Sequence, residues 1–153
     1  YTGWIQVNGK NLSEFTDVNQ RIVGTVQRSH IFNTSVRENL KVGNPAASDE
    51  EIIQILRILE LEALVNEMSS GLDTIIGEFG RAVSGGEAKR LAIARVLLSQ
   101  SDVYILDEPT EHLDQELALR IESRVTEFLK EKILIVVTHS GWNHADKTLN
   151  LLR

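Results

Sequence analysis

Residues 83–114 read VSGGEAKRLAIARVLLSQSDVYILDEPTEHLD, and this stretch decides how the rest of the chain is interpreted. It opens with Ser84-Gly85-Gly86-Glu87, in which a serine precedes a glutamate by three positions. This spacing predicts a capping box, in which the serine hydroxyl and the glutamate carboxylate accept hydrogen bonds from each other's amides. The paired glycines let a ligand approach the backbone, and the free amides of a helix start attract anions. The sequence therefore predicts a helix whose first turn can bind an anion.

A short apolar strand follows this helix and ends in acidic residues. Val103 to Leu106 is a continuous apolar run of the kind that buried parallel strands show. Asp107, Glu108 and Pro109 come directly after it. Because α/β sheets bind their ligands at the carboxyl ends of their strands, the two carboxylates are predicted to belong to a functional site.

Together these residues resemble the ATP-binding cassette (ABC) family, the ATPase subunits of ABC transporters. Ser84 to Glu87 is similar to the family's signature loop, Val103 to Asp107 to its Walker B strand, and Glu111 to Asp114 to its D-loop. The resemblance implies an α/β fold with a P-loop NTPase-like parallel sheet core and an α-helical subdomain at about residues 35–100. An ordinary helix followed by an ordinary strand would explain the apolar residues, but not the paired glycines and paired acids.

The resemblance also implies roles for individual residues. Glu108 would orient the attacking water, and His139 would contact the γ-phosphate, so both are candidate catalytic residues. Asp107 and Gln27 would hold Mg²⁺, and Gln27 would also sense the nucleotide. The remaining residues that would bind ATP are Ser84, Gly85, Gly86, Glu87 and Asp114. We expect Glu87 to point back at the helix cap. The alternative for a lone glutamine after a strand is a solvated loop residue, and for a lone histidine a structural residue.

Composition limits the class of protein. The 153 residues are 42% apolar and 25% charged, which is typical of a globular domain. The net charge of -6 argues against a surface that binds nucleic acid over the whole chain. Without cysteine, the chain forms no disulfide and no thiolate metal site.

Further elements are predicted along the chain. Capping boxes at Ser35 and Ser48, each with glutamate three residues on, predict two more helices. Ile133 to Val137 is predicted to be a buried strand, and Thr148 to Leu152 a final strand. By resemblance, the strands that lead to Gln27, Asp107 and His139 are neighbours in that order.

A phosphate-binding loop of the form Gly-x-x-x-x-Gly-Lys-Ser/Thr does not occur in this sequence. Gly9-Lys10 is the only Gly-Lys pair, but Asn11 follows it and Trp4 stands where the first glycine is required. We therefore interpret Gly9-Lys10 as a hairpin turn. The chain is expected to be the C-terminal portion of a nucleotide-binding domain, and to be inactive as an ATPase by itself.

The function implied by the resemblance is that of an ATP-hydrolysing subunit of an ABC exporter, with ATP and Mg²⁺ as cofactors. Its partners would be a second ABC ATPase domain and the transmembrane domains of the exporter, at the cytoplasmic face of the bacterial inner membrane. Two alternatives remain open: a non-transport ABC ATPase acting in translation or on DNA, and a catalytically inactive ABC fragment. The short span from Gln27 to Ser84 argues against the DNA-repair members. The sequence from Thr110 to Asp114 most resembles that of the CydC-type subunit, one half of the thiol-reductant exporters involved in cytochrome bd assembly.

Overall fold

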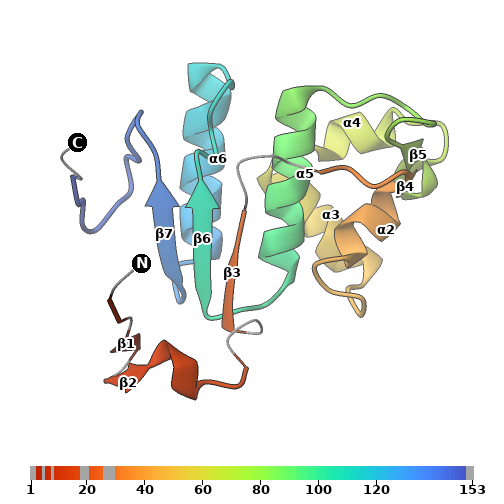
Figure 1. The fold of residues 1–153 in the computed structure, drawn as a ribbon. Coiled ribbons are helices and arrows are strands. Elements are labelled where there is room, and N and C mark those ends of the chain that lie inside the picture. The colour runs from red at the N-terminus through yellow and green to blue at the C-terminus, as the bar shows by residue number, and fades with distance from the viewer. Residues whose placement is uncertain (1–2, 5, 8, 18–20, 26–29, 151–153) are drawn as a thin grey trace.

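The structure is a computed structural model that describes residues 3–4, 6–7, 9–17, 21–25 and 30–150 (Figure 1). Its strands are β1 (Gln6–Val7), β2 (Lys10–Asn11), β3 (Ile22–Gly24), β4 (Thr34–Ser35), β5 (Ile75–Ile76), β6 (Val103–Asp107) and β7 (Ile133–Val137). Its α-helices are α2 (Val36–Lys41), α3 (Asp49–Ile58), α4 (Glu62–Asn66), α5 (Gly85–Leu98) and α6 (Gln115–Phe128). Two short 3-10 helices are η1 (Leu12–Glu14) and η2 (Gly71–Asp73).

A parallel sheet forms the centre of the molecule, with β6 between β3 and β7. Val103 of β6 lies opposite Ile22 of β3 on one side and Ile133 of β7 on the other. This order confirms the arrangement that the family resemblance predicts. Because the strands are parallel, their carboxyl ends meet at one edge of the sheet, where the acidic residues after β6 lie.

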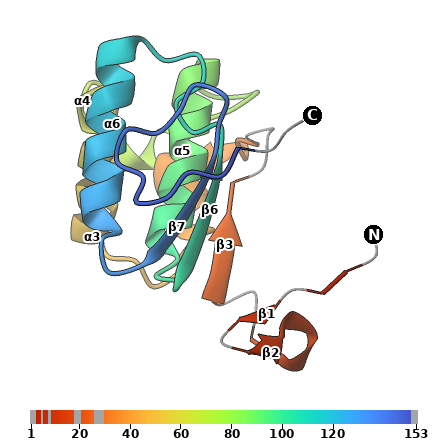
Figure 2. The same ribbon diagram turned by 90° about the vertical axis from the view of Figure 1, so that its left-hand side faces the viewer.

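Helices α5 and α6 cover one face of this sheet (Figure 2). Tyr104 and Leu106 of β6 are buried on that face, at 2% and 0% exposure. Ile121 and Val125 of α6, four residues apart on the same side of the helix, are also buried. The apolar run in β6 is therefore part of the hydrophobic core, as predicted for a buried parallel strand.

The prediction that Ile133–Val137 is a buried strand is wrong for one face of β7. Ile133, Ile135 and Val137 are 58%, 45% and 51% exposed, whereas Leu134 and Val136 are partly buried. Side chains of a strand alternate between the two faces of a sheet, and the described helices cover only one face. A uniformly aliphatic strand therefore leaves three large apolar side chains in contact with solvent.

The segment between β3 and β6 packs α2, α3 and α4 beside α5, on the far side from β7 (Figure 1). Leu40, Leu56 and Leu97 of α2, α3 and α5 are all buried. The predicted capping box at Ser48 is complete, because Ser48 and Glu51 each accept from the other's amide. At Ser35 the serine accepts from the Glu38 amide at 3.1 Å, so this half of the box is present.

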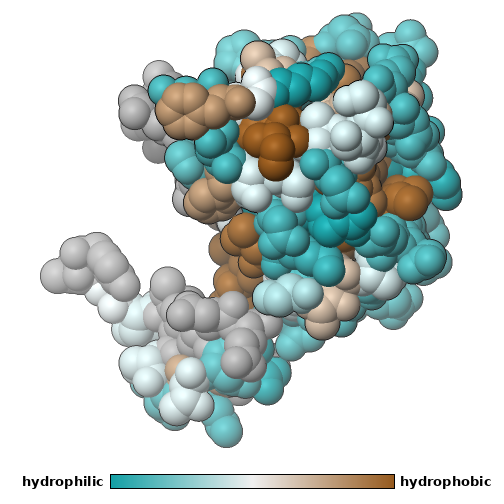
Figure 3. All heavy atoms as spheres, turned by 90° about the vertical axis from the view of Figure 1, so that its right-hand side faces the viewer, coloured by the Kyte–Doolittle hydropathy of each residue, from teal (hydrophilic) through white to brown (hydrophobic). Residues whose placement is uncertain are grey.

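The two ends of the described chain lie outside this core. Val7 and Lys10 are antiparallel partners and Gly9 has a φ of +77°, which confirms the predicted hairpin. Figure 3 shows this hairpin at the bottom, with a hollow lined by apolar atoms between it and the rest of the molecule. The prediction of a final strand is wrong over residues 148–150, which form no regular structure and pair with none of the strands in the described part of the chain. Residues 151–152 lie outside the described part of the chain.

Candidate functional site

Two acidic residues lie at the carboxyl end of β6, as predicted. Asp107 ends the strand, and Glu108 follows it with a left-handed backbone, φ +45°. For a residue with a Cβ this conformation costs about 1–3 kcal/mol, so other contacts must hold it. One such contact is the Glu108 amide, which donates to the carbonyl of Val137 at 2.8 Å. The chain leaves the sheet at Glu108, and the Glu108 side chain consequently lies beside the end of β7.

The Glu108 carboxylate is held by the two residues that follow β7. One oxygen accepts from the His139 amide at 3.0 Å and lies 2.8 Å from His139 Nδ1. The other oxygen accepts from Thr138 Oγ1 at 3.1 Å. The Glu108 side chain is 22% exposed, and that of His139 is 74% exposed. The structure therefore brings together the two residues predicted to be catalytic, and adds Thr138, which the sequence analysis missed.

These contacts change the acidity of both side chains. Burial raises the pKa of Glu108, but the hydrogen bonds from His139 and Thr138 outweigh burial and leave this pKa below its usual value. The hydrogen bond to Glu108 and its negative charge raise the pKa of His139. Glu108 is therefore an ionised carboxylate at neutral pH, able to accept a hydrogen bond from water but not to donate a proton.

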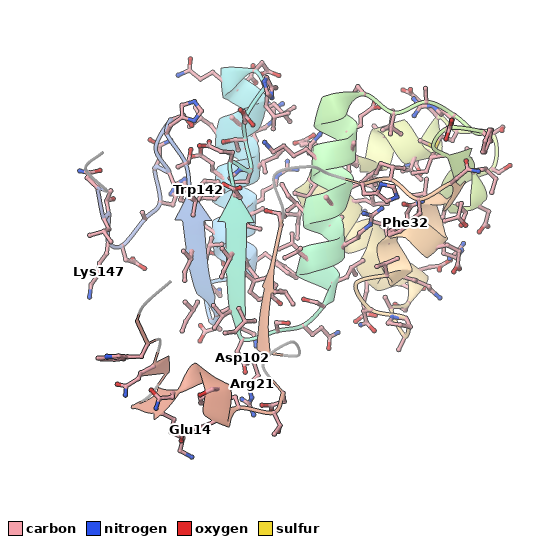
Figure 4. The ribbon with its side chains drawn as sticks, viewed as in Figure 1. Glu14, Arg21, Phe32, Asp102, Trp142 and Lys147 are labelled. Carbon is pink, nitrogen blue, oxygen red and sulfur yellow. The ribbon has the colours of Figure 1, made fainter. Side chains whose placement is uncertain are left out.

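The segment after His139 is anchored to α6. Trp142 Nε1 donates to Thr126 Oγ1 at 3.1 Å, and the Asn143 side chain donates to Glu122 at 2.9 Å. Figure 4 shows Trp142 at the end of the sheet where the candidate site lies. Arg21 and Asp102 lie at the opposite end, where they form an ion pair of 3.4 Å (Figure 4). The anchors on α6 restrict how far His139 can move from Glu108.

Asp107 lies next to Glu108 but has different surroundings. Its amide donates to Thr25 Oγ1 at 2.9 Å, which ties the end of β6 to the residue after β3. In the described residues its carboxylate has no hydrogen-bond or ion-pair partner, and it is partly exposed. A single open carboxylate fits Mg²⁺, which keeps several waters and takes one or two carboxylates together with substrate phosphates. Gln27, the other predicted metal residue, lies outside the described residues.

No group of three or more histidine or acidic side chains is close enough to hold a metal ion by itself, within the ranges that the structure describes. A transition-metal centre built from protein side chains is thus not found in this part of the chain. The donor set at Asp107 is of the oxygen type that suits Mg²⁺.

The predicted capping box at the start of α5 is present. Ser84 Oγ accepts from the Glu87 amide at 3.3 Å, and the Glu87 carboxylate accepts from the Ser84 amide at 2.7 Å. Glu87 therefore points back at the cap, as expected. A Cβ placed on Gly85 would meet no atom within 4 Å, so the first turn of α5 is open on that side. A phosphate can approach the backbone amides there.

The loop from Glu108 to Asp114 joins the candidate site to α6. Asp114 is the N-cap of α6, and its side chain accepts from the Leu117 amide at 2.9 Å. His112 has a left-handed backbone, φ +64°, and an 80% exposed side chain. In the described chain Asp114 thus stabilises a helix start, and its predicted contact with nucleotide stays a prediction.

The chain belongs to the ABC transporter family. The family model described as "ABC transporter" matches residues 1–111 of the 153, which include the helix start at Ser84 and the acidic end of β6. The confirmed fold class is therefore that of an ABC ATPase domain, an α/β parallel sheet with helices.

Individual relatives are ABC exporters. The chain is 40% identical over 139 residues to the glutathione/L-cysteine transport system ATP-binding/permease protein CydC of Escherichia coli K12, covering 90% of this chain and 24% of that protein. It is 35% identical over 150 residues to a Staphylococcus aureus (strain bovine RF122 / ET3-1) ATP-binding/permease protein named for multidrug export, covering 95% of this chain and 26% of that protein.

A solved structure agrees with these relatives. A bacterial Atm1-family ABC exporter with ATP bound superposes with a TM-score of 0.83 at 27% identity, covering 91% of this chain and 25% of that one. The chain thus spans about a quarter of the length of the exporters it matches. In the described part of this chain, none of the helices has the length and apolarity to cross a membrane.

Proposed function

We propose that this chain forms the C-terminal portion of the ATP-binding and hydrolysing domain of an ABC exporter. The observation that carries the proposal is the Glu108 carboxylate, held ionised by Thr138 and His139 at the carboxyl end of a parallel strand, beside the open carboxylate of Asp107. The similarity to exporter ATPases over 90% or more of this chain supports it.

In this proposal each residue at the end of the sheet has a separate role. Glu108 orients and polarises the attacking water, because it is an ionised carboxylate fixed by its neighbours. His139, whose pKa is raised by Glu108, places a donor beside the phosphate that departs. Asp107 and Gln27 hold Mg²⁺, which when bound neutralises charge that develops on the phosphates.

In the same proposal, the start of α5 binds the ATP that the partner domain holds. Two ABC ATPase domains close face to face, and the amides after Ser84 bind the γ-phosphate of the ATP held by the other domain. Glu87 is engaged at its own cap and so keeps its charge turned toward Ser84. We propose that this closure is coupled to transport by the transmembrane domains of the exporter, and that it takes place at the cytoplasmic face of the membrane.

The resemblance of the loop at Thr110–Asp114 to CydC-type proteins extends the proposal to a thiol-reductant exporter, and the similarity to CydC of E. coli supports it. Inverted membrane vesicles that contain the exporter should accumulate glutathione or cysteine in an ATP-dependent manner. A transporter that hydrolyses ATP but moves neither thiol would refute this extension and leave the ATPase proposal intact.

The 153-residue chain alone is proposed neither to bind ATP tightly nor to hydrolyse it. Asp107, Glu108 and His139 supply polar groups, but the sequence holds no Gly-Lys-Ser/Thr loop to grip the phosphates. Each charge-assisted contact is worth about 1.5–3 kcal/mol, so losing several weakens a micromolar site to about millimolar or worse.

Calorimetry with Mg-ATP tests this pair of proposals, by comparing the purified chain with the proposed full-length transporter. We expect heat of binding and phosphate release from the transporter and neither from the chain. Micromolar ATP binding by the chain alone would show that the phosphate site has been misplaced.

A further inference from the structure

An ion pair joins the helix that starts at Ser84 to the loop that follows Glu108. Lys89 of α5 donates to the Glu111 carboxylate at 2.9 Å. The Lys89 side chain is only 15% exposed and that of Glu111 is 36% exposed. The two residues are separated by 22 positions in sequence, so this contact ties two segments that the local chain does not hold together.

Hydrogen bonds within the loop link the position of Glu111 to that of Glu108. The Glu111 amide donates to the carbonyl of Glu108 at 3.2 Å, which closes a tight turn. Thr110, inside this turn, is 8% exposed and accepts from the Leu113 amide at 3.2 Å through its own carbonyl. A shift of Glu111 relative to α5 would therefore also shift Glu108.

A second contact brings the same two segments together closer to the helix start. A Cβ built on Gly86 would lie 3.4 Å from Leu113 Cδ2, so the loop rests directly on the first turn of α5. Gly86 permits this approach and Lys89, about one turn further on, fixes it with a charge. Lys89 also lowers the pKa of Glu111, which keeps this carboxylate charged at neutral pH.

We propose that Lys89 and Glu111 are a positioning pair, which sets where the Glu108 carboxylate lies relative to the phosphate-binding start of α5. This inference rests on the proposed function, in which Glu108 acts on the ATP of its own domain and the start of α5 acts on the ATP held by the partner domain. Neither Lys89 nor Glu111 touches the reacting atoms, and each acts through the loop. The main effect of the pair is on the position of Glu108 and not on the free energy of unfolding, because partly exposed ion pairs contribute little to folding.

The test measures ATPase kinetics of the proposed full-length transporter with Lys89→Gln, Glu111→Gln and the reversed pair Lys89→Glu with Glu111→Lys. The glutamine variants remove charge but keep polarity. We expect each to lower kcat about three- to tenfold with the KM for ATP changed less than about twofold, because positioning acts on the transition state and not on binding. The reversed pair should recover kcat to within about twofold of the wild type, since it restores the attraction.

Lys132→Gln is the matched control, since Lys132 also forms an ion pair with a carboxylate, that of Asp102 at 3.3 Å, but lies at the other end of the sheet. It should leave kcat unchanged. If the single variants keep wild-type kcat, or if the reversed pair is as slow as they are, the positioning pair is refuted. A wild-type transporter without ATPase activity, or a fully active Glu108→Gln variant, would instead overturn the proposed function and this inference with it.

Discussion

Ser84 and Ser48 provide a matched pair for testing whether the start of α5 binds phosphate. Both serines are N-caps with a glutamate at the third helical position, and both capping boxes are complete. The serine hydroxyl accepts from the glutamate amide at 3.3 Å in α5 and 3.2 Å in α3. Replacing either serine by leucine should therefore cost the same stability, about 0.5–2 kcal/mol. In a domain of this size that corresponds to a fall in Tm of about 2–4 °C for each kcal/mol.

The two substitutions should differ in their effect on ATP. A leucine at Ser84 fills the open space beside Gly85 and screens the first amides of α5 from a phosphate. Loss of one charge-assisted hydrogen bond costs about 1.5–3 kcal/mol, which weakens ATP-driven association at least about tenfold. Ser48 lies at the start of α3 and is not part of the proposed nucleotide site.

Sedimentation of the complete ATP-binding domain, with and without ATP and in a hydrolysis-deficient background, measures this difference. We expect Ser84→Leu to weaken ATP-driven dimerisation while Ser48→Leu leaves it at the wild-type level, with similar losses of Tm. Equal dimerisation by the two variants would show that the first turn of α5 does not bind phosphate.

Two further predictions concern the contact between His139 and Glu108 and the buried side chain of Asn39. NMR titration of His139 should give a pKa above the ordinary 6.5, and Glu108→Gln should return it toward that value, whereas Glu127→Gln should not. The contact with Glu108 consequently stabilises the fold fully between the lowered pKa of Glu108 and about pH 6.5, and this contribution is lost as the pH falls through the pKa of Glu108 or rises through the raised pKa of His139. Asn39→Ala should lower the free energy of unfolding by about 2–4 kcal/mol, measured by denaturant unfolding, because it leaves buried partners unsatisfied. Asn39 is 0% exposed, accepts from the Phe32 amide and donates to its carbonyl, so an unchanged midpoint would contradict this reasoning.

The fold was predictable where a local pattern decides the structure. The Ser84–Glu87 spacing specified the start of α5, and the apolar run before Asp107 specified β6. The run Ile133–Val137 has the same character as β6 but three of its five side chains are exposed, since burial depends on what covers each face of the sheet. Local sequence holds no information about that cover.

The candidate site was predictable in part. Glu108 and His139 could be predicted as site residues because they match sequence motifs of the ABC family. The structure places their side chains 2.8 Å apart. Thr138 and Thr25 were missed, because a threonine after a strand is common and the partner of each lies far away in the sequence. Their position directly beside His139 and at the end of β3 was the signal that could have found them.

The central claim is that this chain supplies the group that activates water for ATP hydrolysis. Glu108→Gln in the proposed full-length transporter tests it most directly, because the amide keeps the size of the side chain and removes its basicity. In single-turnover assays we expect hydrolysis to slow by roughly 10²–10⁴-fold while ATP still binds. The control Glu127→Gln, at a 74% exposed side chain that pairs with Lys130, should hydrolyse ATP at the wild-type rate. Near-normal turnover by Glu108→Gln would contradict the account.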